Sequence, residues 1–140
     1  MSLEIGVEPV TAPGPVADVK IATSADEAAW DRFVAQNPHA TGYHEWAWRQ
    51  VFARAFGHEP IYLMAAKGDR IEGILPLVYI KSFLFGRVLA SLPFLNYGGI
   101  VADGDTAARG LVEMAVDIGR SRRCRHVELR HQERRFPTLP

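Results

Sequence analysis

The tetrapeptide Asn96-Tyr97-Gly98-Gly99 is the densest group of residues that could take part in chemistry. Two adjacent glycines permit positive φ and let a ligand approach the backbone closely, and the flanking Asn and Tyr side chains offer polar tips. The same four residues also make an ordinary tight turn, so a turn and a binding site are alternatives here. A phosphate-binding loop is excluded, because neither GxxxxGK[ST] nor a GxGxxG after a strand occurs.

A second candidate is the pair Trp46 and Arg49. If residues 44–56 form one helix, Trp46 lies opposite Trp48, on the face that carries Arg49, at about 100° per residue. One interpretation places Trp46 under the preceding loop, since large aromatic side chains are mostly buried. The other makes it a ligand or partner contact, because an exposed Trp beside an Arg is a typical anchor.

The remaining reactive side chains do not form a recognisable catalytic or metal site, so no catalytic residue is assigned. Cys124 follows two arginines, which would lower the pKa of an exposed thiol, but no partnering base is indicated and a small buried filler is favoured. Glu72 and Glu128 lie on predicted strands, where most carboxylates are solvated. No GxSxG occurs, and the histidines lack HExxH or paired Cys/His spacing: His39, His44, His58, His126 and His131.

These candidates are positioned by a predicted hairpin. The apolar runs 61–66 and 71–80 are separated by Lys67-Gly68-Asp69-Arg70, the spacing and turn chemistry of a tight hairpin. The second run is apolar on both alternating sets, which predicts a central strand covered on both faces. Pro76 removes one backbone donor from it, so it marks a bulge or splayed strands, or it lies where its N–H would have no partner.

Three helices and further strands surround the hairpin. SFLFGRVLASLP (82–93) is predicted as a second pass of extended chain, and FLNYGGIV (94–101) as a turn leading into another strand. The first helix starts at Ser24, with Glu27 three residues on as in a capping box, and ends at Asn37-Pro38. The second covers 44–56 and stops at Gly57, and the third covers 106–121. Strands are predicted at 16–22 and 126–130. The buried helix stripes are Trp30, Phe33 and Val34; Trp48, Val51, Phe52, Ala55 and Phe56; and Ala108, Leu111, Val112, Ala115 and Ile118.

Length, composition and charge limit the class of protein. A chain of 140 residues with 48% hydrophobic content forms one domain, predicted at 16–132 between a flexible lead-in (1–15) and a linker (133–140). The order of elements predicts an α/β (α+β) fold, a mixed, mainly antiparallel sheet with helices on both faces. The 16 basic and 16 acidic residues cancel, which argues against a dedicated DNA or RNA binder.

Charge and cysteine use also bear on location. Residues 1–80 hold 6 Lys/Arg against 10 Asp/Glu, whereas residues 81–140 hold 10 against 6. The single cysteine suits a reducing compartment, and Glu4 and Glu8 stand where a signal peptide would be basic and apolar, so a cytoplasmic location is expected. The most lipophilic stretch is interrupted by Arg87 and Pro93, short of the roughly 20 apolar residues of a membrane span.

Several long motifs, in order and with matching spacing, resemble one known family. They are W-x-x-F-V (30–34), NPHATGYHEWAW (37–48), FGHEP (56–60), GILPL (73–77), FGRVLASLPFLNYGGIVAD (85–103) and HVELRH (126–131). From about residue 31 onward the chain resembles the N-terminal half of FemAB-like proteins, in particular the branch associated with PEP-CTERM/exosortase exopolysaccharide systems.

The resemblance implies a GNAT-type fold, that of the acyl-CoA N-acyltransferases. FemAB-like proteins use two such domains in tandem, and relatives transfer an aminoacyl group from aminoacyl-tRNA to an amine on a peptidoglycan precursor. Acyl-CoA or aminoacyl-tRNA is thus implied as donor, and a small-molecule, glycan or peptide precursor of the cell envelope as acceptor. The sequence departs from the family at 133–140, where a second domain would begin, and it lacks the Arg/Gln-x-x-Gly-x-Gly/Ala loop before Thr106.

Two hypotheses follow from the resemblance. The first is an acyltransferase, or its acceptor-side half, in which Tyr97, Gly98 and Gly99 line the cleft and Trp46 or Arg49 holds the acceptor. The catalytic half would then be missing and the chain inactive alone, because half a cleft can bind without reacting. The second is a non-catalytic binding or homodimerisation module that uses the surface a second domain would cover.

Overall fold

A long β-hairpin forms the centre of the sheet. In the computed structural model, which describes residues 2–4, 17–84, 86–91 and 99–129, it consists of β3 (Glu59–Lys67) and β4 (Arg70–Ser82). Gly68 lies in the turn at φ 62°, a left-handed value that glycine adopts without a steric penalty. Lys67 pairs with Arg70 across the turn, so the predicted hairpin is confirmed.

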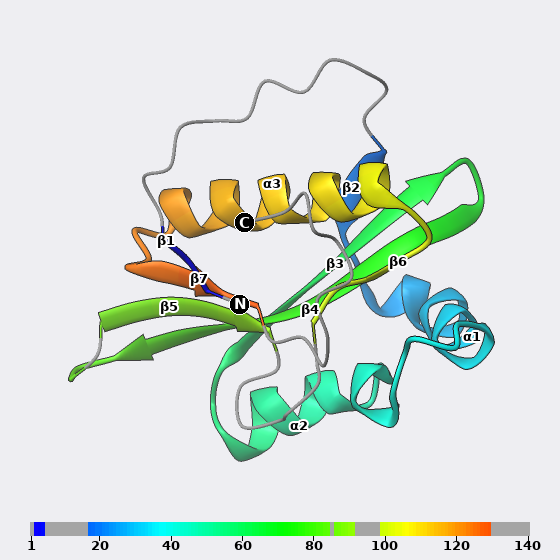
Figure 1. Cartoon of the computed structure of the whole chain (residues 1–140). Coiled ribbons are helices and arrows are strands. Elements are labelled where there is room, and N and C mark those ends of the chain that lie inside the picture. The colour runs from blue at the N-terminus through cyan, green and yellow to red at the C-terminus, as the bar shows by residue number, and fades with distance from the viewer. Residues whose placement is uncertain (1, 5–16, 85, 92–98, 130–140) are drawn as a thin grey trace.

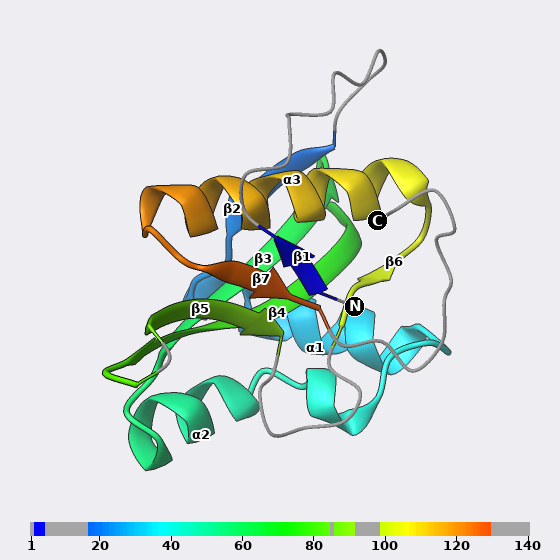
Figure 2. The same ribbon diagram turned by 60° about the vertical axis from the view of Figure 1, so that its left-hand side comes forward.

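The described residues form a sheet of seven strands in the order β1-β7-β5-β4-β3-β2, and β6 also pairs with β4 (Figures 1 and 2). Among the described strands, β5 and β7 form a parallel pair and all other pairs are antiparallel, which confirms the predicted mixed, mainly antiparallel sheet. The other strands are β1 (Ser2–Glu4), β2 (Asp18–Ile21), β5 (Gly86–Ser91), β6 (Val101–Ala102) and β7 (His126–Glu128).

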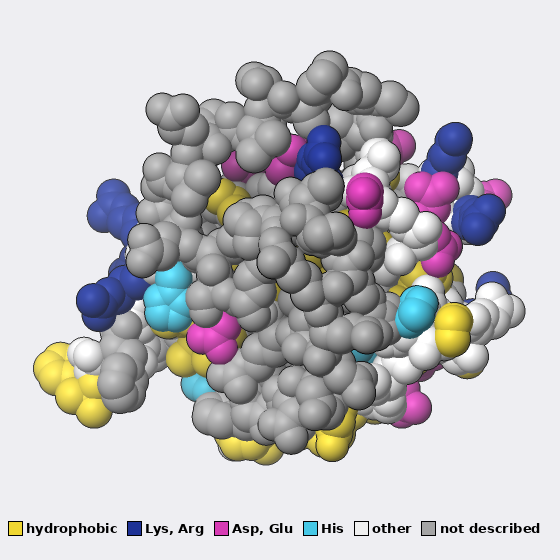
Figure 3. Space-filling model, in the orientation of Figure 1, with side chains coloured by type: hydrophobic (Ala, Val, Ile, Leu, Met, Phe, Trp, Pro, Cys, Tyr) yellow, Lys and Arg dark blue, Asp and Glu magenta, His cyan; other side chains and the backbone are white. Residues whose placement is uncertain are grey.

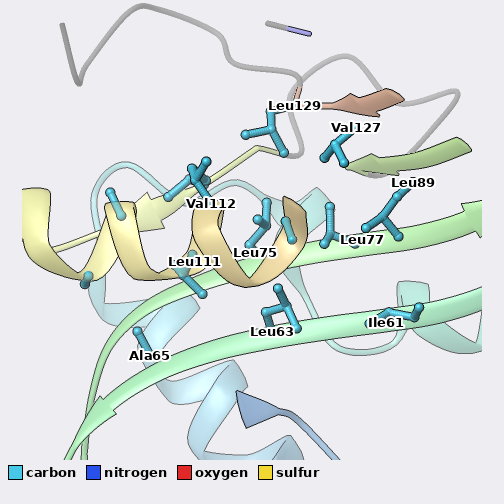
Figure 4. Packing of buried hydrophobic residues seen from close by; sticks show 14 of the residues in the cluster. Ile61, Leu63, Ala65, Leu75, Leu77, Leu89, Leu111, Val112, Val127 and Leu129 are labelled. Carbon is cyan, nitrogen blue, oxygen red and sulfur yellow. The ribbon is translucent and has the colours of Figure 1, made fainter. Parts of the chain in front are cut away.

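Helices cover both faces of the sheet. On one face lies α3 (Asp105–Ser121), and on the other lie α1 (Glu27–Gln36) and α2 (Trp48–Ala55) (Figure 1). Leu63 and Leu75 point into the cluster under α3 (Figure 4), whereas Tyr62 and Ile74, one position earlier on each strand, point into the cluster under α1 and α2. Each fully buried leucine contributes about 1.5–3 kcal/mol. The prediction of a central strand covered on both faces is confirmed.

One edge strand of the sheet was predicted from the sequence and the other was not. The strand predicted at 16–22 is β2, at one edge. At the other end, residues 2–4 form β1 although a structureless lead-in was expected. Leu3 lies opposite Val127, so β1 pairs with the edge that β7 would otherwise leave open. The rest of the predicted lead-in and the linker at 133–140 lie outside the described residues.

The first helical segment has a capping box, but it lies one residue earlier than predicted. The backbone N–H of Thr23, not of Ser24, donates to a carboxylate three residues on, Asp26 Oδ2 at 2.9 Å. A short 3-10 turn, η1 (Ser24–Asp26), then leads into α1. Asp26, rather than Glu27, is the carboxylate of the capping box, and it also forms an ion pair with Lys20 Nζ at 3.0 Å. As predicted, the helix ends before Asn37-Pro38.

The second helix is shorter than predicted, and most of its expected buried stripe is exposed. A 3-10 turn, η2 (Gly42–His44), and extended backbone at Glu45 (ψ 143°) precede α2, which starts only at Trp48. Phe52 is buried, but Val51 is 38% exposed and Phe56 48%, with Ala55 also exposed. Trp46, outside the helix, packs against the sheet in the cluster with Phe52, so two helical turns bury one stripe residue fully.

The C-terminal elements agree with the sequence pattern. The inner stripe of α3 is buried except for the half-buried Ile118, and Val127 and Leu129 are buried beside it. The last strand ends at Glu128 rather than at Arg130, which lies outside the described part. In residues 17–84, 86–91 and 99–129 no helix combines the length and apolar character that a membrane crossing needs.

Candidate functional site

Within the described part of the chain, the strand pairing on one side of β4 stops at Leu77 and resumes at Ile74, on either side of Pro76. On one side of β4, Leu77 pairs with Ser91 of β5, and pairing resumes only at Ile74 with Val101 of β6. On that side, Leu75 and Pro76 have no partner strand among the described residues; we call this stretch the pairing gap. Pro76 lies in this stretch, and the pattern fits both interpretations of it, a splayed strand and a position whose missing N–H would have no partner.

The far end of the pairing gap is fixed by a buried histidine. The Nδ1 atom of His44 accepts a hydrogen bond from the backbone N–H of Thr41 at 3.1 Å. The proton of the neutral ring therefore lies on Nε2, which is 2.9 Å from the carbonyl oxygen of Gly99 and donates to it. His44 is 3% exposed and thus ties η2 to the residue that leads into β6.

Three aromatic rings pack together at the sheet position opposite Pro76, which Tyr62 occupies. Tyr62 pairs with Pro76 across β3 and β4 and is fully buried. Its ring stacks on Trp30 with centroids 5.0 Å apart and meets Trp46 edge-on at 5.5 Å. The backbone N–H of Trp46 donates to Asp31 Oδ1 at 2.8 Å, which holds this tryptophan before α2 begins.

The aromatic cluster decides between the two interpretations of Trp46. With 3% of its surface exposed, Trp46 lies inside the molecule, as the buried interpretation expects, and the exposure that the ligand-contact interpretation assumed is not found. Trp46 precedes α2, so its position does not follow a helical wheel. The Arg49 side chain nevertheless lies over the ring of Trp46, with its guanidinium carbon 5.4 Å from the ring centroid, a cation–π geometry.

Two buried polar atoms beside this cluster have no hydrogen-bond partner among the described residues: Tyr62 Oη and Arg49 Nε. Burial raises the pKa of the Tyr62 phenol, and the positive charge of Arg49 lowers it only in part. The phenol therefore keeps its proton at neutral pH and, like Arg49, is a donor. Two donors among aromatic rings can bind a carbonyl or carboxylate oxygen and favour negative charge on it.

The structure brings together only some of the predicted site residues. Trp46 and Arg49 are in contact, and Gly99 is joined to the same region through His44. The predicted site residues Asn96, Tyr97 and Gly98 lie outside the described residues. Sequence reasoning missed His44 and Tyr62. Thr41 three residues before His44, with the spacing of a cap, was a signal for the first; only the tertiary fold reveals the second.

Other candidate chemistry is weaker. No group of three His, Cys, Asp or Glu side chains that could hold a metal occurs within 17–84, 86–91 and 99–129. Cys124 is buried as predicted for a filler, and burial raises the pKa of its thiol despite Arg122 and Arg87.

A surface pocket of about 400 Å³ lies between α1 and the turn of the β3–β4 hairpin. It contains none of the predicted site residues. Its charges compensate one another, since Arg70 lies 3.7 Å from Asp103 and Asn37 donates to Asp103 at 3.3 Å. We therefore place the candidate site at the aromatic cluster, which the Tyr62–Pro76 pair joins to the pairing gap and where two buried donors have no partner among the described residues.

Comparison with known proteins supports the fold alone. No protein-family model matches the sequence, and no curated protein matches it. The structure is similar to the crystal structure of a transcriptional regulator from Bacillus halodurans C-125, with a TM-score of 0.57 and 14% identity over 86% of this chain and 85% of the other. Together with the sheet order and the helices on both faces, the likeness shows a GNAT-like fold.

Proposed function

We propose that this chain is the acceptor-binding lobe of an N-acyl or aminoacyl transferase of the FemAB-like type, acting on a cell-envelope or exopolysaccharide precursor. The GNAT-like fold is the fold that the sequence resemblance implies for such transferases, although the similar solved structure is described as a transcriptional regulator. The motifs in order along the sequence favour the FemAB-like branch and its donors, acyl-CoA or aminoacyl-tRNA.

One observation carries the proposal: beside one aromatic cluster, Tyr62 and Arg49 have two buried donors without hydrogen-bond partners among the described residues. In the alternation set by the carbonyl of Glu72, which accepts from the backbone N–H of Asp103 on the β6 side, the backbone group of β4 that faces the gap is the carbonyl of Pro76, and it can accept from an amide N–H of a ligand. Arg49 and Tyr62 can bind its carboxylate or carbonyl oxygen. Arg49 is half-buried on a short helix, so its flexible side chain can move aside to admit a ligand.

The division of labour follows from what the site contains. The described part of the site provides hydrogen-bond donors but no adjacent pair of nucleophile and base. Transfer to an amine depends largely on holding donor and acceptor in line, so we propose that this lobe positions one reactant and a second domain supplies the other. The free, buried Cys124 suits the reducing cytoplasm, where we place the reaction.

A thermal-shift comparison with acyl-CoAs, charged tRNA and nucleotide-sugar precursors tests the proposal. A ligand at about a hundred times its dissociation constant stabilises the folded state by about 2.7 kcal/mol. We expect the shift to fall in Arg49→Gln and to persist in Arg54→Gln, a matched change at an exposed position of the same helix. If none of these ligands shifts the midpoint, or both variants respond like the wild type, the proposed site is wrong.

A second candidate function is a non-catalytic homodimerisation module. The exposed side chains of Val51 and Phe56 on α2 favour it, because they form part of an amphipathic face left uncovered by the described residues. Sedimentation velocity distinguishes the two: a concentration-dependent dimer that Val51→Ser weakens, without any ligand-induced shift, favours the module.

A further inference from the structure

The tip of the hairpin that joins β4 and β5 exposes two large apolar side chains. Phe83 is 102% exposed and Leu84 is 78% exposed, immediately after β4 ends at Ser82. Figure 3 shows hydrophobic side chains at the end of this hairpin, projecting from the lower left of the molecule as oriented in Figure 1. The β3–β4 turn, at the other end of β4, is polar instead: Gly68 and Asp69. An apolar tip is therefore not a general feature of this sheet.

The residues directly behind the tip carry positive charge that has no acidic partner in the described part of the chain, although Arg87 donates a hydrogen bond to the carbonyl oxygen of Arg122. Lys81 and Arg87 lie opposite one another in the β4–β5 register, an arrangement of like charges that disfavours pairing. The aliphatic part of Arg125 lies over Gly86, so close that a Cβ there would meet its Cδ at 2.8 Å. Within the described residues, the ion pairs involve none of these three cations, whereas the nearby Arg122 is paired with Glu59.

Neither feature helps the chain to fold. Exposed apolar surface gains nothing on folding, and the Lys81–Arg87 repulsion opposes it. Both become favourable against a surface that is negatively charged outside and apolar inside. Two projecting side chains are also far too small an area for a stable protein interface, which buries about 1,000 Å² or more.

We propose that this hairpin tip docks on an anionic lipid surface. Phe83 and Leu84 enter the boundary between headgroups and acyl chains, and Lys81, Arg87 and Arg125 lie at the level of the lipid phosphates. The hairpin tip inserts into one leaflet only, and it does not cross the membrane. This inference is independent of the transferase proposal, because lipid binding requires neither donor nor acceptor.

Vesicle flotation of the full chain tests the inference. We expect it to bind vesicles of equal parts phosphatidylglycerol and phosphatidylcholine more tightly than vesicles of phosphatidylcholine alone, and to be released by salt. The double variant Phe83→Ser/Leu84→Ser should bind at least about tenfold more weakly, given the apolar area it withdraws from the membrane. Lys81→Gln/Arg125→Gln should lose more than about tenfold on the anionic vesicles, at about fivefold per cation.

Matched controls come from the same chain. Ile21→Ser removes an exposed apolar side chain from β2, and Lys67→Gln removes an exposed cation at the opposite hairpin, so both should bind vesicles like the wild type. In Phe83→Trp the added fluorescence should shift to the blue on vesicles and be quenched by brominated acyl chains.

The inference is overturned if the wild type binds both kinds of vesicle equally, or if the tip variants bind as tightly as the wild type. Loss of a concentration-dependent dimer in Phe83→Ser/Leu84→Ser with unchanged vesicle binding would likewise overturn it, and would make the tip a protein contact. Because no substrate is present, none of these results bears on the thermal-shift test of the candidate site.

Discussion

At the scale of single residues, Tyr62 shows a conflict between stability and function. Its ring is fully buried between Trp30 and Trp46, but its hydroxyl has no hydrogen-bond partner among the described residues. A buried polar group without a partner costs about 1–3 kcal/mol. Folding alone would favour phenylalanine at this position, so we attribute the hydroxyl to ligand binding.

The variant Tyr62→Phe should therefore be more stable than the wild type, by about 1 kcal/mol in urea unfolding, because no buried hydroxyl remains unpaired. It should also respond less to any ligand found by thermal shift. A loss of stability would instead mean that the hydroxyl has a structural partner, and would remove it from the candidate site.

The same substitution has a signature at alkaline pH. Burial raises the pKa of the Tyr62 phenol in the folded state, so above about pH 10 the unfolded chain loses this proton while the folded chain retains it. Below about pH 10 the ionisation of Tyr62 therefore does not affect the free energy of unfolding, and above it the free energy of unfolding falls as the pH rises. Tyr62→Phe should flatten the alkaline limb of unfolding free energy against pH; an unchanged slope would show that Tyr62 is not shielded from water.

For single residues, the sequence predicted the burial of Cys124 but not the tertiary contacts of the candidate site. Cys124 was expected to be a buried filler and is one. The pairing of Trp46 with Arg49 was expected, but for a helical reason that does not apply, since Trp46 precedes α2. The spacing of Thr41 and His44 indicates a cap, but the contact of His44 with Gly99 could not be predicted, because the two residues lie 55 positions apart in the sequence.

At the scale of elements, periodic patterns identified those segments whose packing is set by their own period. The hairpin and α3 follow their alternation and helical stripe closely. The segment before α2 does not, because His44 must reach Gly99 and Trp46 must pack on Trp30, which extended backbone at Glu45 permits and a helix would prevent. Tertiary contacts thus override helical propensity here.

Gly73 tests how closely the elements around the pairing gap pack. A Cβ at this position would lie 3.0 Å from Leu111 Cδ1 and 3.1 Å from the Cβ of Ala102, where α3 and β6 meet β4. We expect Gly73→Val to lower the unfolding free energy by about 1–3 kcal/mol, the usual cost of overpacking, and to weaken ligand binding as β6 shifts.

The matched control is Gly42→Ala, since a Cβ there would meet nothing within 4 Å. Its midpoint of urea unfolding should stay close to that of the wild type. Equal stability of the Gly73→Val variant would contradict the close approach of β6 to β4 that defines one end of the pairing gap.

At the scale of the whole molecule, β4 connects the two proposed surfaces. Phe83 follows Pro76 by seven residues along one strand, which at about 3.3 Å per residue separates tip and gap by at most roughly 23 Å. If the tip enters the membrane by about 5–10 Å, the gap lies roughly 15 Å above the headgroup boundary. That height suits the polar head of a lipid-linked acceptor rather than its lipid chain.

If both proposals hold, the tip should matter for membrane-bound acceptors alone. With the partner domain present, Phe83→Ser/Leu84→Ser should slow transfer to an acceptor embedded in vesicles about tenfold, in line with its weaker partitioning, and leave transfer to the water-soluble head group unchanged. Arg49→Gln should slow both, because it alters the candidate site itself. Mass spectrometry of the two acceptors measures both rates. Equal slowing of both by the tip variant would mean that Phe83 and Leu84 act on the reaction centre, and the separation of docking and transfer along β4 would be wrong.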